Sequence, residues 1–462
     1  MSTFFPEAWI LVAMVGTFLL TVFLFRQPVA VSLAAGAVVG AIVAGQGFPL
    51  RHFVEGTFVY LDTILIISCA MLFMRGIQAS GLLETVAHYL VLAFRNWPTV
   101  LLVVMTVFAM SAGMVTGSST AAVLTTGAIA AQVFASMGLN KARVGALIAM
   151  AGLLGMIAPP VSIPVMIIGG GVDMPYEGFN LPLLLLTVPT AILCSLWIGW
   201  KGIRRVGDAS QLPPSVHREY GWRLYLPLLV FAGLVIAENS FPTVFPSLGL
   251  PIAFLAAYAI CPLCGRRFNL LRTARQAVHD ALPILGILVG VGMFIQIMTL
   301  TGARGMIVEG FAGLPRSLFY GSIVVSMPLF GAVSAFGSAS ILGVPFLLNL
   351  LGSGVIVTAS SLALFASLGD LVPPTALAGL FAAQVVGENN YLRILARCGM
   401  PALFVMAVAS ASLIGAPTLE RLLFQSSGVS RGLFLGGVVA GLAALVLGLE
   451  WAKRRVVQKE ST

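Results

Sequence analysis

The sequence GMVTGSST, residues 113–120, interrupts a run of 45 residues, 96–140, that carries no charged side chain. One membrane-spanning helix needs about 20 apolar residues, so this run is about twice too long for a single crossing. Gly and Ser destabilise a helix interior and favour turns. We therefore expect two helices that enter the membrane, turn at 113–120 and leave on the same side, as a re-entrant hairpin.

The pattern occurs a second time, where GAVSAFGSAS, residues 331–340, interrupts 53 uncharged residues, 317–369. Each run is followed by a stretch with a Pro-Pro pair, GMIAPPVSIP at 155–164 and GDLVPPT at 369–375. A Pro-Pro pair removes backbone donors and keeps the preceding residue out of helical geometry. We expect each stretch to join two half-helices by unwound chain, which membranes tolerate only where protein or a water-filled cavity covers it.

The composition excludes most soluble proteins. The 462 residues are 59% hydrophobic and 9% charged, against about 45–50% and about 25% in soluble domains. A soluble enzyme, a nucleic-acid binder and a disordered chain are therefore excluded, and an all-α polytopic membrane protein remains. Single spans are expected at 9–25, 28–45, 57–79, 181–200, 223–237, 249–264, 281–300, 401–414 and 432–450.

An internal repeat relates the two halves of the chain. The corresponding features, in order, are Pro28 with Pro251, Gly81 with Gly302, Gly117 with Gly337, and Pro159 with Pro373. We divide the chain into a first repeat at 1–200, a cytoplasmic connection at 201–222, a second repeat at 223–415, and an extra C-terminal helix with a basic cytoplasmic tail at 416–462.

Charge predicts the orientation of the repeats. The net charge of +9 reflects basic residues clustered in the connections 201–223 and 265–275 and in the tail, which the positive-inside rule places in the cytoplasm. The N-terminus is then periplasmic and the C-terminus cytoplasmic. The first hairpin opens to the cytoplasm and the second outward, so the halves form inverted repeats, as in secondary transporters.

The candidate cation- and substrate-binding residues lie at the four breaks. They are Thr116, Gly117, Ser118, Ser119, Thr120, Pro159, Pro160, Ser162, Ser334, Gly337, Ser338, Ser340, Gly369, Asp370, Pro373, Pro374 and Thr375. Hydroxyls and unwound carbonyls offer the oxygens that a hard cation prefers, and helix N-termini favour anions. Na⁺ ligands are expected among Ser118, Ser119, Ser338 and Asp370. A blander alternative is that the small residues only allow close helix packing.

Asp370 has three alternative roles, because an acid at membrane depth is a functional candidate by default. It ligates a cation, carries a proton, or caps the following half-helix. We expect Asp62, Glu238 and Asp280 at the membrane interface instead. Since no other charged side chain is clearly aimed at the breaks, the sequence does not identify the substrate.

Other chemistry is not indicated. The sequence has no P-loop, which argues against ATP drive within this chain. The lone Cys261-x-x-Cys264 pair lacks the further ligands that a zinc site needs. We expect no catalytic residues and no cofactor other than Na⁺ as a coupling ion.

These motifs resemble those of the large membrane (M) subunit of TRAP transporters, in the ion transporter superfamily. The resemblance rests on Pro28-Val29-Ala30, Phe73-Met74-Arg75-Gly76-Ile77, Thr116-Gly117-Ser118-Ser119, Gly155 through Pro164, and Gly369 through Pro374. Thr116 stands where the family usually has Ser and keeps the hydroxyl, whereas Asp370 is atypical. The extra helix at 432–450 lies beyond the family's usual core.

The resemblance implies Na⁺-driven uptake of an organic anion, often a carboxylate, across the bacterial inner membrane. An elevator motion would carry the hairpins and broken helices past a scaffold with arms, formed by 9–45, 223–264 and parts of 57–94 and 281–316. Partners implied by the family are a small four-helix membrane subunit and a periplasmic substrate-binding protein. One alternative is a stand-alone carrier or cation/proton antiporter of the same superfamily. Another is a non-transporting membrane scaffold, which paired unwound segments argue against.

Overall fold

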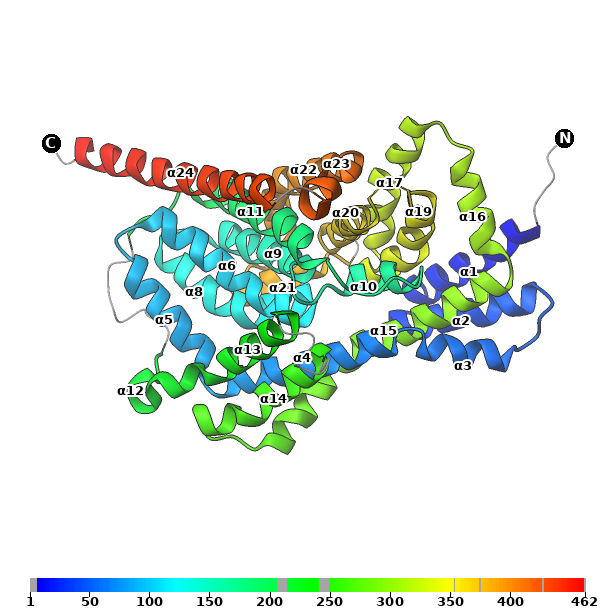
Figure 1. The fold of residues 1–462 in the computed structure, drawn as a ribbon, viewed down its shortest axis with the longest axis horizontal. Coiled ribbons are helices and arrows are strands. Elements are labelled where there is room, and N and C mark those ends of the chain that lie inside the picture. Colours follow the sequence, from blue (N-terminus) through cyan, green and yellow to red (C-terminus); the bar gives the residue numbers. More distant parts are fainter. Residues whose placement is uncertain are drawn as a thin grey trace.

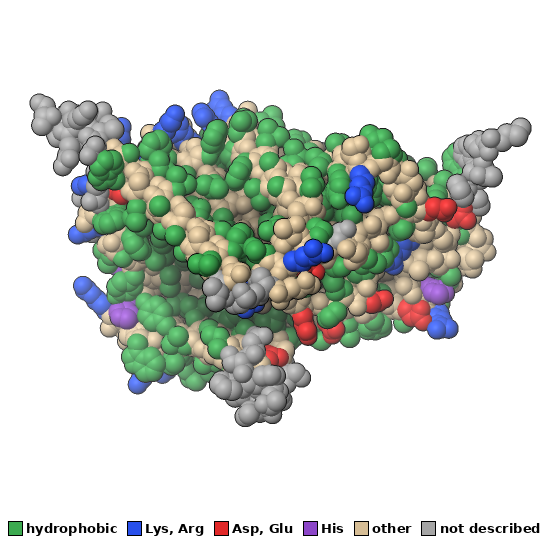
Figure 2. All heavy atoms as spheres, turned by 45° about the horizontal axis from the view of Figure 1, so that its top comes forward, with side chains coloured by type: hydrophobic (Ala, Val, Ile, Leu, Met, Phe, Trp, Pro, Cys, Tyr) green, Lys and Arg blue, Asp and Glu red, His purple; other side chains and the backbone are tan. Residues whose placement is uncertain are grey.

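The computed structural model describes residues 6–205, 214–240, 249–352, 354–373, 375–425 and 428–460. Within these ranges the chain forms helices and no strand, which confirms the predicted all-α class. Eight of the described helices are long and apolar enough to cross a membrane. Hydrophobic side chains cover much of the face seen in Figure 2, and the charged ones lie mostly toward its margins. The fold is that of a polytopic membrane protein.

The first half contains eleven α-helices and one π-helical turn in the described residues. They are α1 (Pro6–Phe23), α2 (Val29–Val43), α3 (Leu50–Phe58), α4 (Leu61–Ala79), α5 (Leu82–Phe94), α6 (Pro98–Thr116), α7 (Ser119–Ala122), η1 (Val123–Gly127), α8 (Ala128–Ser136), α9 (Lys141–Ile157), α10 (Ile163–Gly170) and α11 (Asn180–Gly199).

The second half continues after residue 213. Its helices are α12 (His217–Tyr220), η3 (Gly221–Tyr225), α13 (Leu226–Ser240), α14 (Gly249–Cys264), α15 (Leu270–Leu300), α16 (Ala303–Ala312), α17 (Arg316–Gly331), α18 (Ala335–Ser338), η4 (Ala339–Gly343), α19 (Val344–Asn349), α20 (Val355–Leu368), η5 (Gly369–Leu371), α21 (Leu377–Val386), α22 (Tyr391–Ile414), α23 (Ala416–Glu420), η6 (Arg421–Gln425) and α24 (Gly428–Glu460).

The helices pack as two groups (Figure 1). The scaffold group consists of α1–α4 and α13–α15, in which α15 packs along α2, α3 and α4, and α14 packs on α4 and α13. The body group consists of α6–α11 and α17–α22, with α9 packed between α6, α11 and α21. Helices α5 and α16 connect the groups along the chain. The same division into scaffold, arms and body is implied by the resemblance described above.

The two halves repeat one order of elements. In each, a long scaffold helix (α4 or α15) ends at a glycine in left-handed conformation, Gly81 (φ 81°) or Gly302 (φ 76°), which starts the connecting helix. A helix of the hairpin, a serine cap, a four-residue α-helix and a five-residue π-helical turn follow in both. This agreement supports the sequence repeat, and the opposite orientation of the halves in a membrane stays a prediction.

Four predicted spans differ clearly from the helices observed, and one of them, 401–414, is the second part of the longer helix α22 (Tyr391–Ile414). The span predicted at 57–79 is divided, because α3 ends at Phe58 and α4 starts after Tyr60, whose φ of −107° and ψ of 26° leave the helix. Helix α15 begins at Leu270 rather than near 281, since the Asn269 side chain accepts a hydrogen bond from the Arg272 N–H at 3.0 Å and caps it there. The extra helix extends to Gly428–Glu460.

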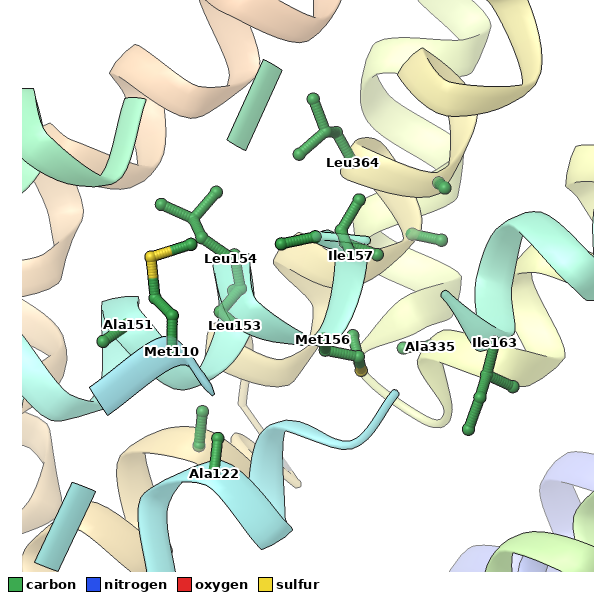
Figure 3. Close-up of a cluster of buried hydrophobic side chains, with 14 of the residues drawn as sticks. Met110, Ala122, Ala151, Leu153, Leu154, Met156, Ile157, Ile163, Ala335 and Leu364 are labelled. Atoms are coloured by element: carbon green, nitrogen blue, oxygen red, sulfur yellow. The ribbon is translucent and has the colours of Figure 1, made fainter. Parts of the chain in front are cut away.

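The centre of the body is a closely packed core, mostly apolar, with the hydroxyl residues Thr358, Ser360, Ser361 and Ser367 buried in α20. Every residue from Val144 to Ile157 in α9 and from Val357 to Leu368 in α20 is buried. Figure 3 shows side chains of both halves meeting there, with Met156 and Ile157 of α9 near Ala335 and Leu364. This core fixes the ends of the broken helices, and thereby the residues at the breaks.

Backbones approach closely at one glycine pair in each half. A Cβ on Gly113 of α6 would lie 2.8 Å from the carbonyl carbon of Gly155 in α9. A Cβ on Gly331 of α17 would lie 3.0 Å from the Cα of Gly369. Each hairpin is therefore held against the first half of its broken helix by a contact that only glycine permits.

Candidate functional site

The first hairpin turns at Gly117, whose φ of 63° favours glycine. A Cβ there would also meet Ile163, the first residue of α10. Ser118 caps α7 by accepting a hydrogen bond from the Ala121 N–H at 3.3 Å. Thr116 is buried and its hydroxyl donates to the Ala112 carbonyl at 2.7 Å, so this hydroxyl is used inside its own helix.

The second hairpin turns at Ser334, which caps α18 by accepting a hydrogen bond from the Gly337 N–H at 3.1 Å. Ser338 is buried and donates to the Met327 carbonyl at 2.7 Å, and Ser340 donates to the Gly337 carbonyl at 2.9 Å. Both hydroxyls satisfy backbone carbonyls of their own hairpin. Ser338, a predicted Na⁺ ligand, does not line the cavity described below.

The first break separates α9 from α10 at Pro159 and Pro160, as predicted. It is fastened to the first hairpin, because the Val161 N–H donates to the Met114 carbonyl at 3.1 Å. The hydroxyl of Ser162 is buried and has no hydrogen-bond partner among the described residues. None of these residues lines the cavity described below, although Met156 at the end of α9 does.

The second break runs from Gly369 to the start of α21 at Leu377. Pro373 is exposed, and the Thr375 hydroxyl donates to the Ala332 carbonyl, which fastens this break to the second hairpin. Pro374 lies outside the described residues. Both predicted helix interruptions are therefore confirmed, and each is hydrogen-bonded to its own hairpin.

Asp370 and Ser119 connect the two halves. The Ser119 hydroxyl, at the start of α7, donates to Oδ2 of Asp370 in the second break, 251 residues away in the chain. Asp370 is 4% exposed and Ser119 is 3% exposed. A buried carboxylate needs compensation by a cation, a proton or hydrogen-bond donors. The first hairpin supplies one donor, and oxygen-bearing side chains of the two halves meet at this point.

These residues line a cavity of about 520 Å³, which we call the tip cavity. Its walls come from α4 and α15 of the scaffold group and from both hairpin tips and the second break of the body group. The predicted residues that it brings together are Ser118, Ser119, Thr120, Ser334 and Asp370. Leu377, the first residue of α21, also lines it, and first-turn N–H groups of a helix favour anions.

The sequence pattern alone does not reveal that the wall of the tip cavity contains an ion pair. Arg75 of α4 and Asp280 of α15 lie in its wall beside His279. Arg75 Nε donates to Asp280 Oδ2 at 2.7 Å. The expectation that no other charged group faces the site is therefore wrong, and Asp280 is a cavity residue. Its position near a predicted span end concealed this, and the motif around Arg75 was the available signal.

The donor set fits a hard cation better than a transition metal. In the described ranges, no three His, Cys, Asp or Glu side chains come close enough to hold a metal ion. The side-chain oxygens at the tip cavity are hydroxyls, the carboxylates of Asp370 and Asp280, and the Gln78 amide. Na⁺ and similar hard cations prefer oxygen ligands of this kind.

The described chain has eight apolar helices of spanning length. Two of its helices are broken, and they pack with two helical hairpins around a cavity. This combination defines a polytopic membrane transport protein. The family model described as "Tripartite ATP-independent periplasmic transporter, DctM component" matches residues 15–419. The chain therefore belongs to the DctM family, the large component of TRAP transporters. The match ends at residue 419, so α24 lies outside the matched range.

Solved structures show the same fold. The YdaH transporter of Alcanivorax borkumensis is 17% identical, with a TM-score of 0.59 over 88% of this chain and 97% of that one. MtrF of Neisseria gonorrhoeae, described as illuminating a class of antimetabolite efflux pumps, is 14% identical, with a TM-score of 0.54 over 89% of this chain and 94% of that one. A comparison with curated proteins finds no match.

Proposed function

We propose that the chain is the large permease subunit of a TRAP-type transporter that couples Na⁺ to the uptake of an organic anion, a carboxylate, across the bacterial inner membrane. The observation that carries the proposal is the Ser119–Asp370 contact, which joins both halves in the wall of the tip cavity. In this role the two side chains are ligands of the coupling cation. The first turn of α21 and Arg75 supply attraction for the anion.

An elevator motion is consistent with the packing. The body group carries both hairpins and both breaks, and the tip cavity lies where this group meets α4 and α15 of the scaffold group. Sliding of the body would carry the cavity past α4 and α15, while Gly113–Gly155 and Gly331–Gly369 keep each hairpin fixed to its broken helix.

Membership of the DctM family supports the proposal of two partners, a small four-helix membrane subunit and a periplasmic substrate-binding protein. We also propose that the N-terminus is periplasmic. A stand-alone carrier or cation/proton antiporter is the second candidate, which Asp370 and the extra helix α24 favour. The family match favours the tripartite system.

Uptake into proteoliposomes decides between the two. The chain is reconstituted with or without its small subunit, and radiolabelled organic acids are added with or without the binding protein and an inward Na⁺ gradient. The proposal predicts uptake only when all three components and the Na⁺ gradient are present. Uptake by the chain alone would establish the stand-alone carrier, and uptake indifferent to Na⁺ would refute the coupling.

A further inference from the structure

Arg75 of α4 and Asp280 of α15 form an ion pair in the wall of the tip cavity. This pair is separate from the cation site proposed at Ser119 and Asp370. Arg75 Nε donates to Asp280 Oδ2 at 2.7 Å, and a terminal nitrogen of Arg75 contacts the same oxygen. A third nitrogen donates to Gln78 Oε1 at 3.1 Å. The guanidinium therefore has donors directed at a carboxylate, the group that it binds best.

The pair lies between two cavities. Arg75, His279 and Asp280 line the tip cavity and also a second cavity of about 370 Å³, whose other residues are Arg275 and Gln276. This second cavity adjoins the basic connection 265–275, which is predicted to be cytoplasmic. In the conformation described here, the pair thus stands where an anion would pass from the tip cavity toward the cytoplasm.

Charge makes Arg75 the natural contact for that anion. Among the described residues that line the tip cavity, Arg75 is the one lysine or arginine, and Asp370 and Asp280 are both acidic. An anion in a protein cavity needs a cation or hydrogen-bond donors to offset its lost hydration. Because a substrate carboxylate and the Asp280 carboxylate require the same donors of Arg75, they compete for them.

The exposure of the pair makes exchange inexpensive. The side chains of Arg75 and Asp280 are 37% and 32% exposed. Both side chains open onto the tip cavity and the second cavity. When water fills these cavities and screens the charges, an ion pair exposed to this extent contributes little net stability. A buried pair would resist separation much more strongly, since opening it would leave an uncompensated charge.

We propose that Arg75 and Asp280 form an anion-exchange gate, in which the carboxylate of the transported anion replaces Asp280 on Arg75 and Asp280 then reclaims Arg75 when the anion leaves. The proposal rests on the proposed function and names a specificity element of the same site. Both residues belong to the scaffold group, whereas Ser119 and Asp370 belong to the body group. The anion would therefore be handed from the moving group to the scaffold.

Single variants separate this gate from a structural tie between α4 and α15. Loss of either partner breaks a tie, so Arg75→Gln and Asp280→Asn would have the same effect. In a gate the two have opposite effects, because Arg75→Gln removes the anion's contact and Asp280→Asn removes its competitor. The pair Arg51–Glu55, at 2.7 Å on α3, does not line either cavity, and Glu55→Gln is the matched control.

The experiment measures thermal unfolding of the purified full chain while sodium chloride is replaced by sodium acetate, succinate or citrate at constant Na⁺ and ionic strength. We expect at least one carboxylate to raise the melting temperature of the wild type and of Glu55→Gln equally. Arg75→Gln should lose this response. Asp280→Asn should reach half its response at a concentration about 2- to 5-fold lower, the factor by which exposed ion pairs bias an equilibrium.

Three results would overturn the gate: an unchanged response in Arg75→Gln, a lost response in Asp280→Asn, or no response to any carboxylate in both wild type and Asp280→Asn. Each is separable from failure of the proposed function, because Na⁺ is constant here. Uptake that proves independent of Na⁺, with the opposite effects of the two variants preserved, would refute the coupling and leave the gate standing.

Discussion

Replacement of Gly331 by Ala tests the backbone contact that holds the second hairpin to its broken helix. A Cβ at this position would lie 2.8 Å from the Ala366 carbonyl oxygen and 3.0 Å from the Gly369 Cα. Both neighbours are backbone atoms, so no side-chain rotation relieves the overlap and α17 must move away from α20. Overpacking of this kind costs about 1–3 kcal/mol. Higher helix propensity of Ala offsets about 0.5–1 kcal/mol of that cost.

Gly321→Ala is the matched control in the same helix. Gly321 is exposed, and a Cβ there has nothing within 4 Å, so only the gain in helix propensity applies. The five cysteines are all free and buried, which suits an unfolding assay with a dye that reacts with newly exposed thiols. We expect Gly331→Ala to melt below the wild type and Gly321→Ala to melt at or above it. Equal melting temperatures of the two variants would refute the close contact.

Three further predictions concern the contacts between groups, the extra helix and the orientation. Tyr60→Phe removes a buried hydroxyl of the scaffold group that donates to the Ile167 carbonyl of α10 at 3.1 Å. Loss of about 0.5–1.5 kcal/mol should shift the conformational equilibrium about 2- to 12-fold away from the described conformation. Fluorescence transfer between scaffold and body measures this shift, and an unchanged distribution of transfer efficiencies would contradict it. In the extra helix α24, the Glu450 carboxylate accepts a hydrogen bond from the Thr99 N–H in the first turn of α6 at 2.8 Å. Glu450→Gln removes the negative charge from this helix N-terminus, so thermal unfolding should show a loss of about 0.3–1 kcal/mol. Equal or greater stability of the variant would contradict a capping role of Glu450. Single cysteines at Ser210 and Ser247, outside the described residues, should be labelled only from the cytoplasm and only from the periplasm, respectively; reversed labelling would invert the orientation.

Sequence patterns predicted those features that depend on local chemistry. Long uncharged runs, glycine-serine tips and Pro pairs act within a few residues, so the breaks near Gly117, Pro159 and Gly369 lie where the sequence places them. The helix ends were harder to predict. The Asn269 cap extends α15 into a polar stretch that hydropathy alone excludes from a span.

Contacts between the halves could not be predicted, since they depend on how distant elements pack. The sequence identified Ser119 and Asp370 separately, but nothing local indicates that residues 251 positions apart share a hydrogen bond. Arg75 and Asp280 meet across a similar separation. The sequence also does not show which way a serine side chain points. Ser338 donates to a backbone carbonyl of its own hairpin and does not line the cavity.

The most direct test of a cation site at Ser119 and Asp370 is the Na⁺ dependence of uptake by Asp370→Asn in the complete reconstituted transporter. Asparagine keeps the shape and one oxygen of the side chain, which can still accept the Ser119 hydrogen bond, but it loses the charge. If Asp370 and Ser119 hold the coupling cation, the variant should need a much higher Na⁺ concentration for half-maximal uptake, with the protein still folded and inserted. The N-cap of α21 is Ala376, with no side-chain cap, so the structure does not place Asp370 as the cap of that helix. Wild-type Na⁺ dependence in Asp370→Asn would contradict the cation site and leave Asp370 only as the acceptor of the Ser119 hydrogen bond.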